Sequence, residues 1–361
     1  MFGSFGRMMA AAVAVAGVLG TLSAIDVGDG AWAGERFKGQ VLRVGTWGGK
    51  WGDFQKEIIA PKIEAEGGKV EFVLASTQDN IAKLVAARGR EVPIDVLEIL
   101  DALMPTFSRE NLLQKIDLSQ VPNVKYLQDG FYDEWKVATW IVQEGICYNR
   151  EKFKELGLPV PTTYKDLGNP KLEGMVVIPD ITSGGGLANF AGIVYAAGGD
   201  VQNIQPGLDL LKEINALKYW KRAGEAINML QTGDVAAALI YSGHCARVRK
   251  SGEPVDAVMP LMADGKRGVM KNGWIGVVKG TPVPELATFY VNQFINLDFQ
   301  SSWAPAMGVI PSNQEALKTF LADEVSQEMF VPLEENLQID YNKADVPDWT
   351  DRWTRTAGKS S

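Results

Sequence analysis

Histidine and cysteine are scarce in this sequence: its 361 residues contain one histidine and two cysteines. Those side chains supply many metal ligands, catalytic bases and nucleophiles. The lone histidine, His244, stands directly beside Cys245, and because adjacent residues rarely face the same partner we interpret the pair as local packing. No G-x-S-x-G, H-E-x-x-H or phosphate-binding G-x-x-x-x-G-K-S/T pattern occurs. The sequence therefore predicts no metal, no cofactor and no catalytic activity.

The two cysteines, Cys147 and Cys245, leave two alternatives open. In an oxidising compartment they could form a disulfide bond. The disulfide frameworks of small secreted domains, however, contain more cysteines than this. We therefore expect two unpaired, buried thiols.

Clusters of basic residues are also missing, and the formal net charge is -8. Binding to phosphates requires a concentrated Lys/Arg surface, so nucleic acid is excluded as a partner. An acidic balance favours neutral or cationic small molecules, but only weakly, because the charge of a large surface need not match that of one pocket.

Long apolar runs are absent outside the first 33 residues. There, Arg7 precedes a small and apolar stretch from Met8 to about Ala24, and Ala31-Trp32-Ala33 follows. This order is typical of a secretory signal peptide with an A-x-A cleavage site. We expect removal of residues 1–33 to leave a soluble periplasmic protein. An uncleaved signal anchor is the alternative, although the apolar run is short for a bilayer span.

The remaining chain, about 330 residues, exceeds what one hydrophobic core usually supports, which predicts two lobes. Apolar segments bounded by turn residues alternate with amphipathic helical patterns, as in α/β proteins with a largely parallel sheet. Strands are expected at 40–46, 69–75 and 92–100, with a helix after each of the first two. Open sheets of this kind bind ligands at the carboxyl ends of their strands.

A set of short motifs then follows in a fixed order. In chain order they are PTTYKDL (161–167), NPKLEG (169–174), LQTGDV (230–235), YSG (241–243), Trp274, KGTP (279–282) and GVIPSN (308–313). Each is weak by itself, but together they span most of the chain. The set resembles the family-one extracellular solute-binding proteins of ABC transporters, and is most similar to their spermidine/putrescine-binding branch.

This resemblance implies a type II periplasmic binding protein fold, in which two α/β lobes joined by two crossing segments enclose a solute. The crossing segments are expected at about 141–148 and 273–278. The expected lobes are 34–139 with 273–308 for lobe one, and 140–272 with 309–361 for lobe two.

The resemblance also assigns ligand-binding aromatic residues. They are Trp47, Trp51, Tyr241 and Trp274. Aromatic rings offer apolar contact and attract cations, although packing is the alternative role for each ring. In the polyamine binders that this chain resembles, the return crossing has a Trp-x-Asp pattern. This chain has Trp274-Ile275-Gly276 there, which lacks the acid.

Five polar residues complete the candidate binding site. Asp101, Glu144 and Asp180 lie at or just past strand ends, where a carboxylate could pair with an amine. Thr77 and Ser183 lie at helix starts, whose free N–H groups stabilise an anionic group. Capping of helices and turns explains all five equally well. Acids together with helix starts leave an amino-acid-like or opine-like zwitterion open beside a simple cation.

The sequence thus predicts a monomeric binding protein rather than an enzyme. We expect its lobes to close on a small nitrogen-bearing organic solute and then to dock on an ABC permease in the inner membrane. A secreted α/β enzyme that uses Glu144 or Asp180 as an acid or base is one alternative. A solute receptor for a membrane sensor is another.

Spermidine tests the expected charge of the solute. Because Gly276 replaces the family's acid, a long polyamine would leave one ammonium group without a partner, and a stranded buried charge costs several kcal/mol. We expect calorimetry to show weak or no binding of spermidine. Sub-micromolar binding would show that another acid, such as Glu144 or Asp101, has replaced the missing one.

Overall fold

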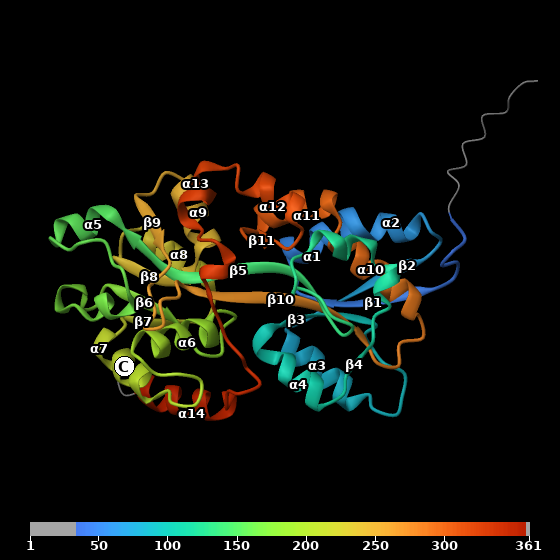
Figure 1. Ribbon diagram of the computed structural model, residues 1–361, viewed down its shortest axis with the longest axis horizontal. Helices are drawn as coiled ribbons and strands as arrows, with labels where there is room; N and C mark the ends of the chain where they lie inside the picture. Colours follow the sequence, from blue (N-terminus) through green and yellow to red (C-terminus); the bar gives the residue numbers. More distant parts are fainter. Residues whose placement is uncertain (1–33, 359–361) are drawn as a thin grey trace, which may run out of the picture.

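The computed structural model describes residues 34–358, so the expected signal peptide at 1–33 lies outside the described residues. Their backbone forms one mixed sheet of 12 strands, in the order β2-β1-β3-β10-β5-β8-β6-β7 with four short strands beside this path. Helices cover both faces of the sheet (Figure 1). The α/β class predicted from the alternating pattern is confirmed.

The first part of the sheet is parallel and contains the three expected strands. β1 (Val41–Thr46) pairs with β2 (Lys69–Leu74) on one side and with β3 (Val96–Leu100) on the other. The helices around it are α1 (Lys50–Phe54), α2 (Ala60–Glu64), α3 (Thr77–Ala86), α4 (Met104–Arg109), α10 (Pro284–Phe294) and α11 (Leu297–Met307). In Figure 1, α3 and α4 lie below the sheet, and α1, α2, α10 and α11 lie above it.

Local chemistry explains where these helices begin. The Ser76 hydroxyl accepts a hydrogen bond from the Asp79 backbone N–H at 3.1 Å and so caps α3. On the inner face of the same helix Leu84 is buried, with Ile81 and Val85 partly buried beside it. This spacing is the amphipathic pattern from which the helix was predicted.

The second part of the sheet is built around the parallel strands β6 and β8. The strands of this part are β6 (Val176–Pro179), β7 (Lys218–Trp220), β8 (Ala237–Tyr241) and β9 (Val255–Val258). Its helices are α5 (Arg150–Glu155), α6 (Gly186–Ala196), α7 (Gln205–Ile214), α8 (Ala223–Gln231) and α9 (Ser242–Lys250).

Two long strands join the two parts. β5 (Val137–Asn149) is buried at every residue, and β10 (Val269–Val278) lies antiparallel to it (Figure 1). β10 also pairs with β3, while β5 also pairs with β8, so both strands belong to both halves of the sheet. The pairing of β5 with β10 is irregular at Gly273, where an added Cβ would come within 1.9 Å of the Trp140 indole. Only glycine fits between these crossing strands.

The apolar core is divided in the same way. One buried cluster surrounds β1, β3 and β10, and two others fill the part around β6 and β8. Of the C-terminal helices, α12 (Gln314–Phe320) packs on α11, α13 (Glu324–Met329) on α9, and α14 (Val346–Ala357) on α7. The expected lobe boundaries 34–139 with 273–308, and 140–272 with 309–361, stay a prediction.

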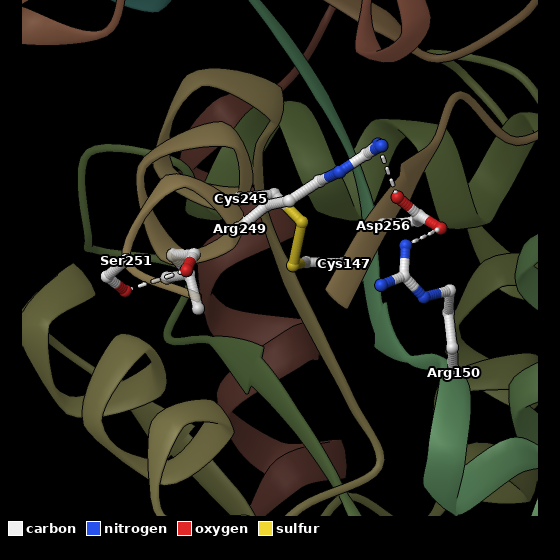
Figure 2. Close-up of a disulfide and its surroundings, with 7 residues drawn as sticks. Cys147, Arg150, Cys245, Arg249, Ser251 and Asp256 are labelled. Carbon is white, nitrogen blue, oxygen red and sulfur yellow. Dashed lines mark hydrogen bonds and ion pairs between the residues drawn. A yellow bond between two sulfur atoms is a disulfide. The ribbon is translucent and has the colours of Figure 1, made fainter. Parts of the chain in front are cut away.

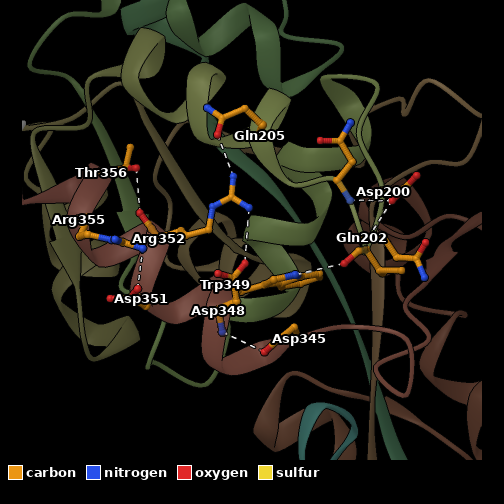
Figure 3. A network of polar contacts seen from close by, with 12 residues as sticks. Asp200, Gln202, Gln205, Asp345, Asp348, Trp349, Asp351, Arg352, Arg355 and Thr356 are labelled. Carbon is orange, nitrogen blue, oxygen red and sulfur yellow. Dashed lines mark hydrogen bonds and ion pairs between the residues drawn. The ribbon is translucent and has the colours of Figure 1, made fainter.

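Polar contacts hold α14 in place (Figure 3). The Trp349 indole N–H donates to the Val201 carbonyl at 3.2 Å, and the Arg352 guanidinium donates to Gln205 at 2.8 Å. These bonds fix the C-terminal segment on the second part of the sheet, so the loop leading into α14 has a defined course. The remaining short strands are β4 (Leu113–Gln114), β11 (Ile310–Pro311) and β12 (Leu337–Gln338). None of the helices in residues 34–358 has the length and apolarity needed to cross a membrane.

The expectation of two unpaired thiols is wrong, because Cys147 and Cys245 form a disulfide bond (Figure 2). Cys147 lies in β5 and Cys245 in α9, and both are fully buried. The pairing of β5 with β8 places α9, which follows β8 directly, against β5. This proximity depends on strand pairing across 98 residues of chain, which no local sequence pattern reveals. Arg150 and Arg249 lie next to the bond, and both donate to Asp256.

The disulfide leads to a prediction about stability. A bond that closes a loop of this length restricts the unfolded chain, and such bonds typically contribute about 2–4 kcal/mol. We expect the Cys147→Ala/Cys245→Ala double variant to unfold several degrees below the parent in a thermal melt. A reductant should lower the melting temperature of the parent and leave that of the double variant unchanged. An unchanged parent melt under full reduction would contradict the prediction.

Candidate functional site

A cavity of about 480 Å³ opens between the two parts of the sheet, and we call it the cleft cavity. Its walls come from the carboxyl ends of β1, β3, β6 and β7, from the starts of α3 and α6, from one residue of β10, and from Tyr341 and two residues of α14. The polar and aromatic residues that line it are Trp47, Ser76, Gln78, Thr182, Ser183, Lys221, Lys271, Tyr341 and Thr350. This is the edge at which open α/β sheets bind ligands.

The lining of the cleft cavity includes an unpaired lysine and two helix starts. Two helices begin at it, α3 next to Ser76 and Gln78, and α6 just after Ser183 and Gly184. Helix starts carry unpaired N–H groups and a partial positive charge. The exposed side chain of Lys221, directly after β7, adds a full charge and has no hydrogen-bond or ion-pair partner within residues 34–358. None of the described residues that line this cavity is Asp or Glu.

Lys271 is the second lysine at this cavity, and an ion pair and a hydrogen bond hold its side chain in place. Its ammonium group lies 2.7 Å from Glu144 and donates to the Gly184 carbonyl at 2.9 Å. Glu144 is fully buried and also accepts a hydrogen bond from the Asn189 amide at 2.9 Å. A buried carboxylate already paired with a lysine is not a free counter-charge for a ligand amine.

A second cavity, of about 290 Å³, borders the cleft cavity, and we call it the side cavity. Asp101, Lys136 and Trp274 line it, while Tyr341 lines both cavities. The Asp101 carboxylate accepts hydrogen bonds from the Asn272 backbone N–H at 2.6 Å and from the Trp274 indole. Burial raises the pKa of Asp101 to about 6, and the hydrogen bond from Trp274 opposes that increase.

Trp51 and Glu98 form a buried group behind the cleft cavity. The Trp51 indole packs edge-on against Trp47, Trp140 and Trp303, and its N–H lies 3.1 Å from Glu98. Glu98 is 2% exposed and also accepts hydrogen bonds from the Thr46 hydroxyl and the Gln55 amide. No cation is paired with it among the residues described, and burial raises its pKa to about 7 despite these hydrogen bonds.

The structure places the residues predicted from the sequence in four different settings. Trp47 and Ser183 line the cleft cavity, whereas Asp101 and Trp274 line the side cavity. Thr77 is buried and its hydroxyl donates to the Glu98 carbonyl at 3.3 Å. Their ligand-binding roles stay predictions.

The remaining predicted residues make contacts within the protein. Asp180 accepts hydrogen bonds from the backbone N–H and the hydroxyl of Thr182, as a turn-capping acid does. The Tyr241 ring lies 3.6 Å from His244, and its hydroxyl donates to the Met307 carbonyl at 3.2 Å. Glu144 is paired with Lys271 as described above.

Four charged residues at or near the cavities are not among those predicted from the sequence: Glu98, Lys136, Lys221 and Lys271. A signal was present for two of them. Glu98 is the single acid in the strand VLEIL, and Lys271 is the one charged residue in a strand that is otherwise mostly apolar. A charged residue inside a buried strand needs a partner, and such positions were open to prediction. Lys221 and Lys136 have no comparable signal, because they lie just outside strands.

Gly276 does not lie where its side chain would face a ligand. Gly276 pairs with Leu97, in the part of β10 that lies beside β3. A Cβ at this position would meet Leu113 at 2.9 Å and the Trp135 carbonyl at 3.3 Å, and Gly276 lines neither cavity. An acid there would not reach a ligand, so weak spermidine binding now rests on Lys221 and the two helix starts instead.

Comparisons with known proteins agree with this geometry. Residues 54–329 match the family described as bacterial extracellular solute-binding protein. No curated protein sequence matches the chain. An ABC transporter protein from Clostridium perfringens has a similar structure, with a TM-score of 0.72, 20% identity, and 88% of this chain and 99% of that chain covered.

Two similar structures contain named ligands. The periplasmic binding protein MotA of A. tumefaciens B6, in complex with glucopine, has a TM-score of 0.67 and 15% identity over 88% of this chain and all (100%) of that chain. AfuA of Actinobacillus pleuropneumoniae, with fructose-6-phosphate bound, has a TM-score of 0.63 and 19% identity over 89% of this chain and 98% of that chain. The two-lobed solute-binding fold expected from the sequence is confirmed, and the ligands of these neighbours differ.

Glu98 leads to a prediction about pH. A buried carboxyl whose pKa is raised from about 4.5 to about 7 is protonated more readily in the folded protein than in the unfolded chain. Its contribution to stability is therefore fully present below pH 4.5 and is lost as the pH rises through 7. We expect the parent to melt at a higher temperature at pH 5 than at pH 8, and Glu98→Gln to reduce this difference. Glu71→Gln, at an exposed glutamate, is the matched control; equal pH profiles for all three proteins would contradict the assignment.

Proposed function

The chain belongs to the bacterial extracellular solute-binding proteins, and we propose that it captures a small solute with an anionic group in the cleft cavity and delivers it to an ABC permease. The family and its structural neighbours are substrate-binding proteins, not enzymes. Family membership implies a location outside the cytoplasm, and the periplasm is our proposal for this chain.

One observation supports an anionic group on the solute: the described residues that line the cleft cavity include the unpaired Lys221 and no acid, while the second lysine, Lys271, is neutralised by Glu144. Lys221 is unpaired there, and the starts of α3 and α6 add partial positive charge on opposite walls. The nearest acid that the sequence suggested, Glu144, is already neutralised by Lys271. A carboxylate or phosphate on the solute would complete this arrangement, whereas a cation would be repelled.

The rest of the cleft cavity is suited to an organic body. Trp47 presents a half-buried ring, and Leu100, Leu103, Ile181 and Leu187 supply aliphatic contacts. A cavity of this volume, lined mostly by apolar groups with a few polar ones, has the typical character of a small-molecule site. We therefore favour an organic acid or phosphate ester over an inorganic anion.

Closure of the two lobes is part of the proposal. Among the strands of residues 34–358, only β5 and β10 continue through both halves of the sheet, so bending of these two strands would move α3 and Trp47 relative to α6 and Lys221. Hinge closure of this kind buries a ligand between domains. A receptor for a membrane sensor would use the same motion, and none of the contacts described above favours it over import.

Lys221 provides the test of this proposal. A screen of organic acids and phosphate esters by thermal shift identifies a ligand, because one present at a hundred times its Kd stabilises the folded state by about 2.7 kcal/mol. For that ligand we expect Lys221→Gln to weaken binding about tenfold, or roughly 1.4 kcal/mol, in calorimetry. Lys69→Gln is the matched control, since Lys69 is also exposed and unpaired but lies at the amino end of β2. Equal affinity of the two variants would contradict the proposal. So would a thermal-shift screen in which only cations stabilise the protein.

A further inference from the structure

A turn near the C-terminus brings Tyr341 to both cavities. The turn consists of residues 339–345 and joins β12 to α14, and we call it the C-terminal turn. β12 pairs with β10 before the turn, and the hydrogen bonds of Trp349 and Arg352 hold α14 after it (Figure 3). Within the turn, the Ala344 N–H donates to the Tyr341 carbonyl at 3.3 Å. A segment distant in sequence from the strands of the cleft therefore supplies a defined part of its wall.

The Tyr341 hydroxyl is free, although the residue as a whole is only 7% exposed. It forms no hydrogen bond with any residue from 34 to 358. Two other tyrosine hydroxyls without a partner, those of Tyr164 and Tyr219, are completely enclosed by protein, whereas that of Tyr341 is not. The Tyr341 ring packs in an apolar cluster of the second part of the sheet, so the hydroxyl is the group that reaches the cavities. A polar group this deeply buried normally has a partner, and here the cavity is the place for one.

The Tyr341 hydroxyl remains protonated and can donate. Burial raises the pKa of Tyr341, and the negative charges of Asp101 and Glu144 raise it further. The same negative charges disfavour an anion beside this hydroxyl, and the anionic group of the solute is already assigned to Lys221 and the two helix starts. The solute group that meets Tyr341 is therefore an uncharged oxygen.

Two more uncharged groups at the cleft cavity are free. The Trp47 indole N–H and the Gln78 amide line it without a hydrogen-bond partner in residues 34–358. The hydroxyls of Ser76 and Thr182, by contrast, already donate within the protein. Trp47 follows β1, Gln78 lies in the first turn of α3, and Tyr341 lies in the C-terminal turn, so the free groups belong to three different segments. Uncharged hydrogen-bonding groups on several walls match a solute with several uncharged oxygens.

We propose that Tyr341 is a specificity-determining residue whose hydroxyl donates to a hydroxyl oxygen of the solute, and that the solute is a hydroxylated organic anion such as a sugar acid or sugar phosphate. This inference rests on the proposed function for the anionic group. An apolar acid would leave the free groups of Tyr341, Trp47 and Gln78 unpaired in the closed cleft. Sites built to hydrogen-bond a hydroxyl reject analogues that lack it for this reason.

Probes with six carbons each separate the hydroxyl contact from the anionic group. Gluconate and glucose 6-phosphate carry hydroxyls and an anionic group, hexanoate and hexyl phosphate carry the anionic group alone, and sorbitol carries hydroxyls alone. With the full mature protein in calorimetry, we expect a hydroxylated anion to bind about tenfold more tightly, or better, than its counterpart without hydroxyls and than sorbitol.

The outcomes of this comparison are distinct. Equal affinity within both pairs of anions would overturn the hydroxyl contact and leave the proposed function intact. Sorbitol that binds as tightly as the hydroxylated anions would overturn the proposed anionic group and leave the hydroxyl contact. Failure of every probe to bind would overturn both.

Tyr341→Phe tests the hydroxyl itself, because it removes one oxygen and keeps the ring. Binding of the hydroxylated anion should weaken about tenfold, as expected for one lost hydrogen bond, while its counterpart without hydroxyls binds as before. The matched control is Tyr164→Phe, since the Tyr164 hydroxyl also lacks a partner but lines neither cavity. A structural role alone would weaken both ligands equally. That result, or an affinity equal to the parent's, would overturn the role of Tyr341.

Tyr341→Cys tests the placement of this side chain without any ligand. The sequence has two cysteines and both are in the disulfide, so the introduced thiol is the one free thiol of the protein. A small neutral thiol reagent should label the folded variant and leave the parent unlabelled, with circular dichroism to establish folding. A folded variant that resists labelling would show that position 341 does not face the cavities and would overturn the proposal. If this variant does not fold, the Tyr341→Phe result decides.

Discussion

The antiparallel pairing of β5 with β10 is the interaction on which the rest of this structure depends. Both strands are buried for most of their length, and both continue through the two halves of the sheet. Glu144, Trp140 and Cys147 lie on β5, while Lys271 and Trp274 lie on β10. These side chains contact groups on neighbouring strands and helices. The register of β5 against β10 therefore decides which of these groups meet.

Strand geometry also explains how one strand contributes different side chains to two neighbouring cavities. Successive side chains of a strand point to opposite faces. On β10, Met270, Asn272 and Trp274 line the side cavity, and Lys271 between them lines the cleft cavity. A single strand therefore supplies a lysine to one cavity and an amide and an indole to the other, and a local shift of one residue would exchange them.

Buried and partly buried carboxylates near this strand pair differ in how their charge is balanced. Asp95 is paired with Arg43 at 3.0 Å, and Glu144 with Lys271 at 2.7 Å. Glu98 and Asp101 instead have neutral donors, and burial raises the pKa of both. The two acids without an ion pair are those next to the tryptophans, Glu98 beside Trp51 and Asp101 beside Trp274. In these two places an indole N–H, rather than a lysine ammonium, is the donor to the carboxylate.

Much of the fold could be predicted from the sequence alone. The α/β class, the strands of the first half and the helix after Ser76 follow from periodicity and capping, because those features depend on residues within a few positions of one another. The carboxyl edge of the sheet as the candidate site follows in the same way, and Trp47 and Ser183 lie there. Only the tertiary structure decided four other features: the bond between Cys147 and Cys245, the packing of Trp51 on Glu98, the location of Gly276 and the unpaired state of Lys221. Each of these depends on partners brought together by strand pairing and by the irregularity at Gly273, and the register of distant strands is not recorded in any local pattern of residues.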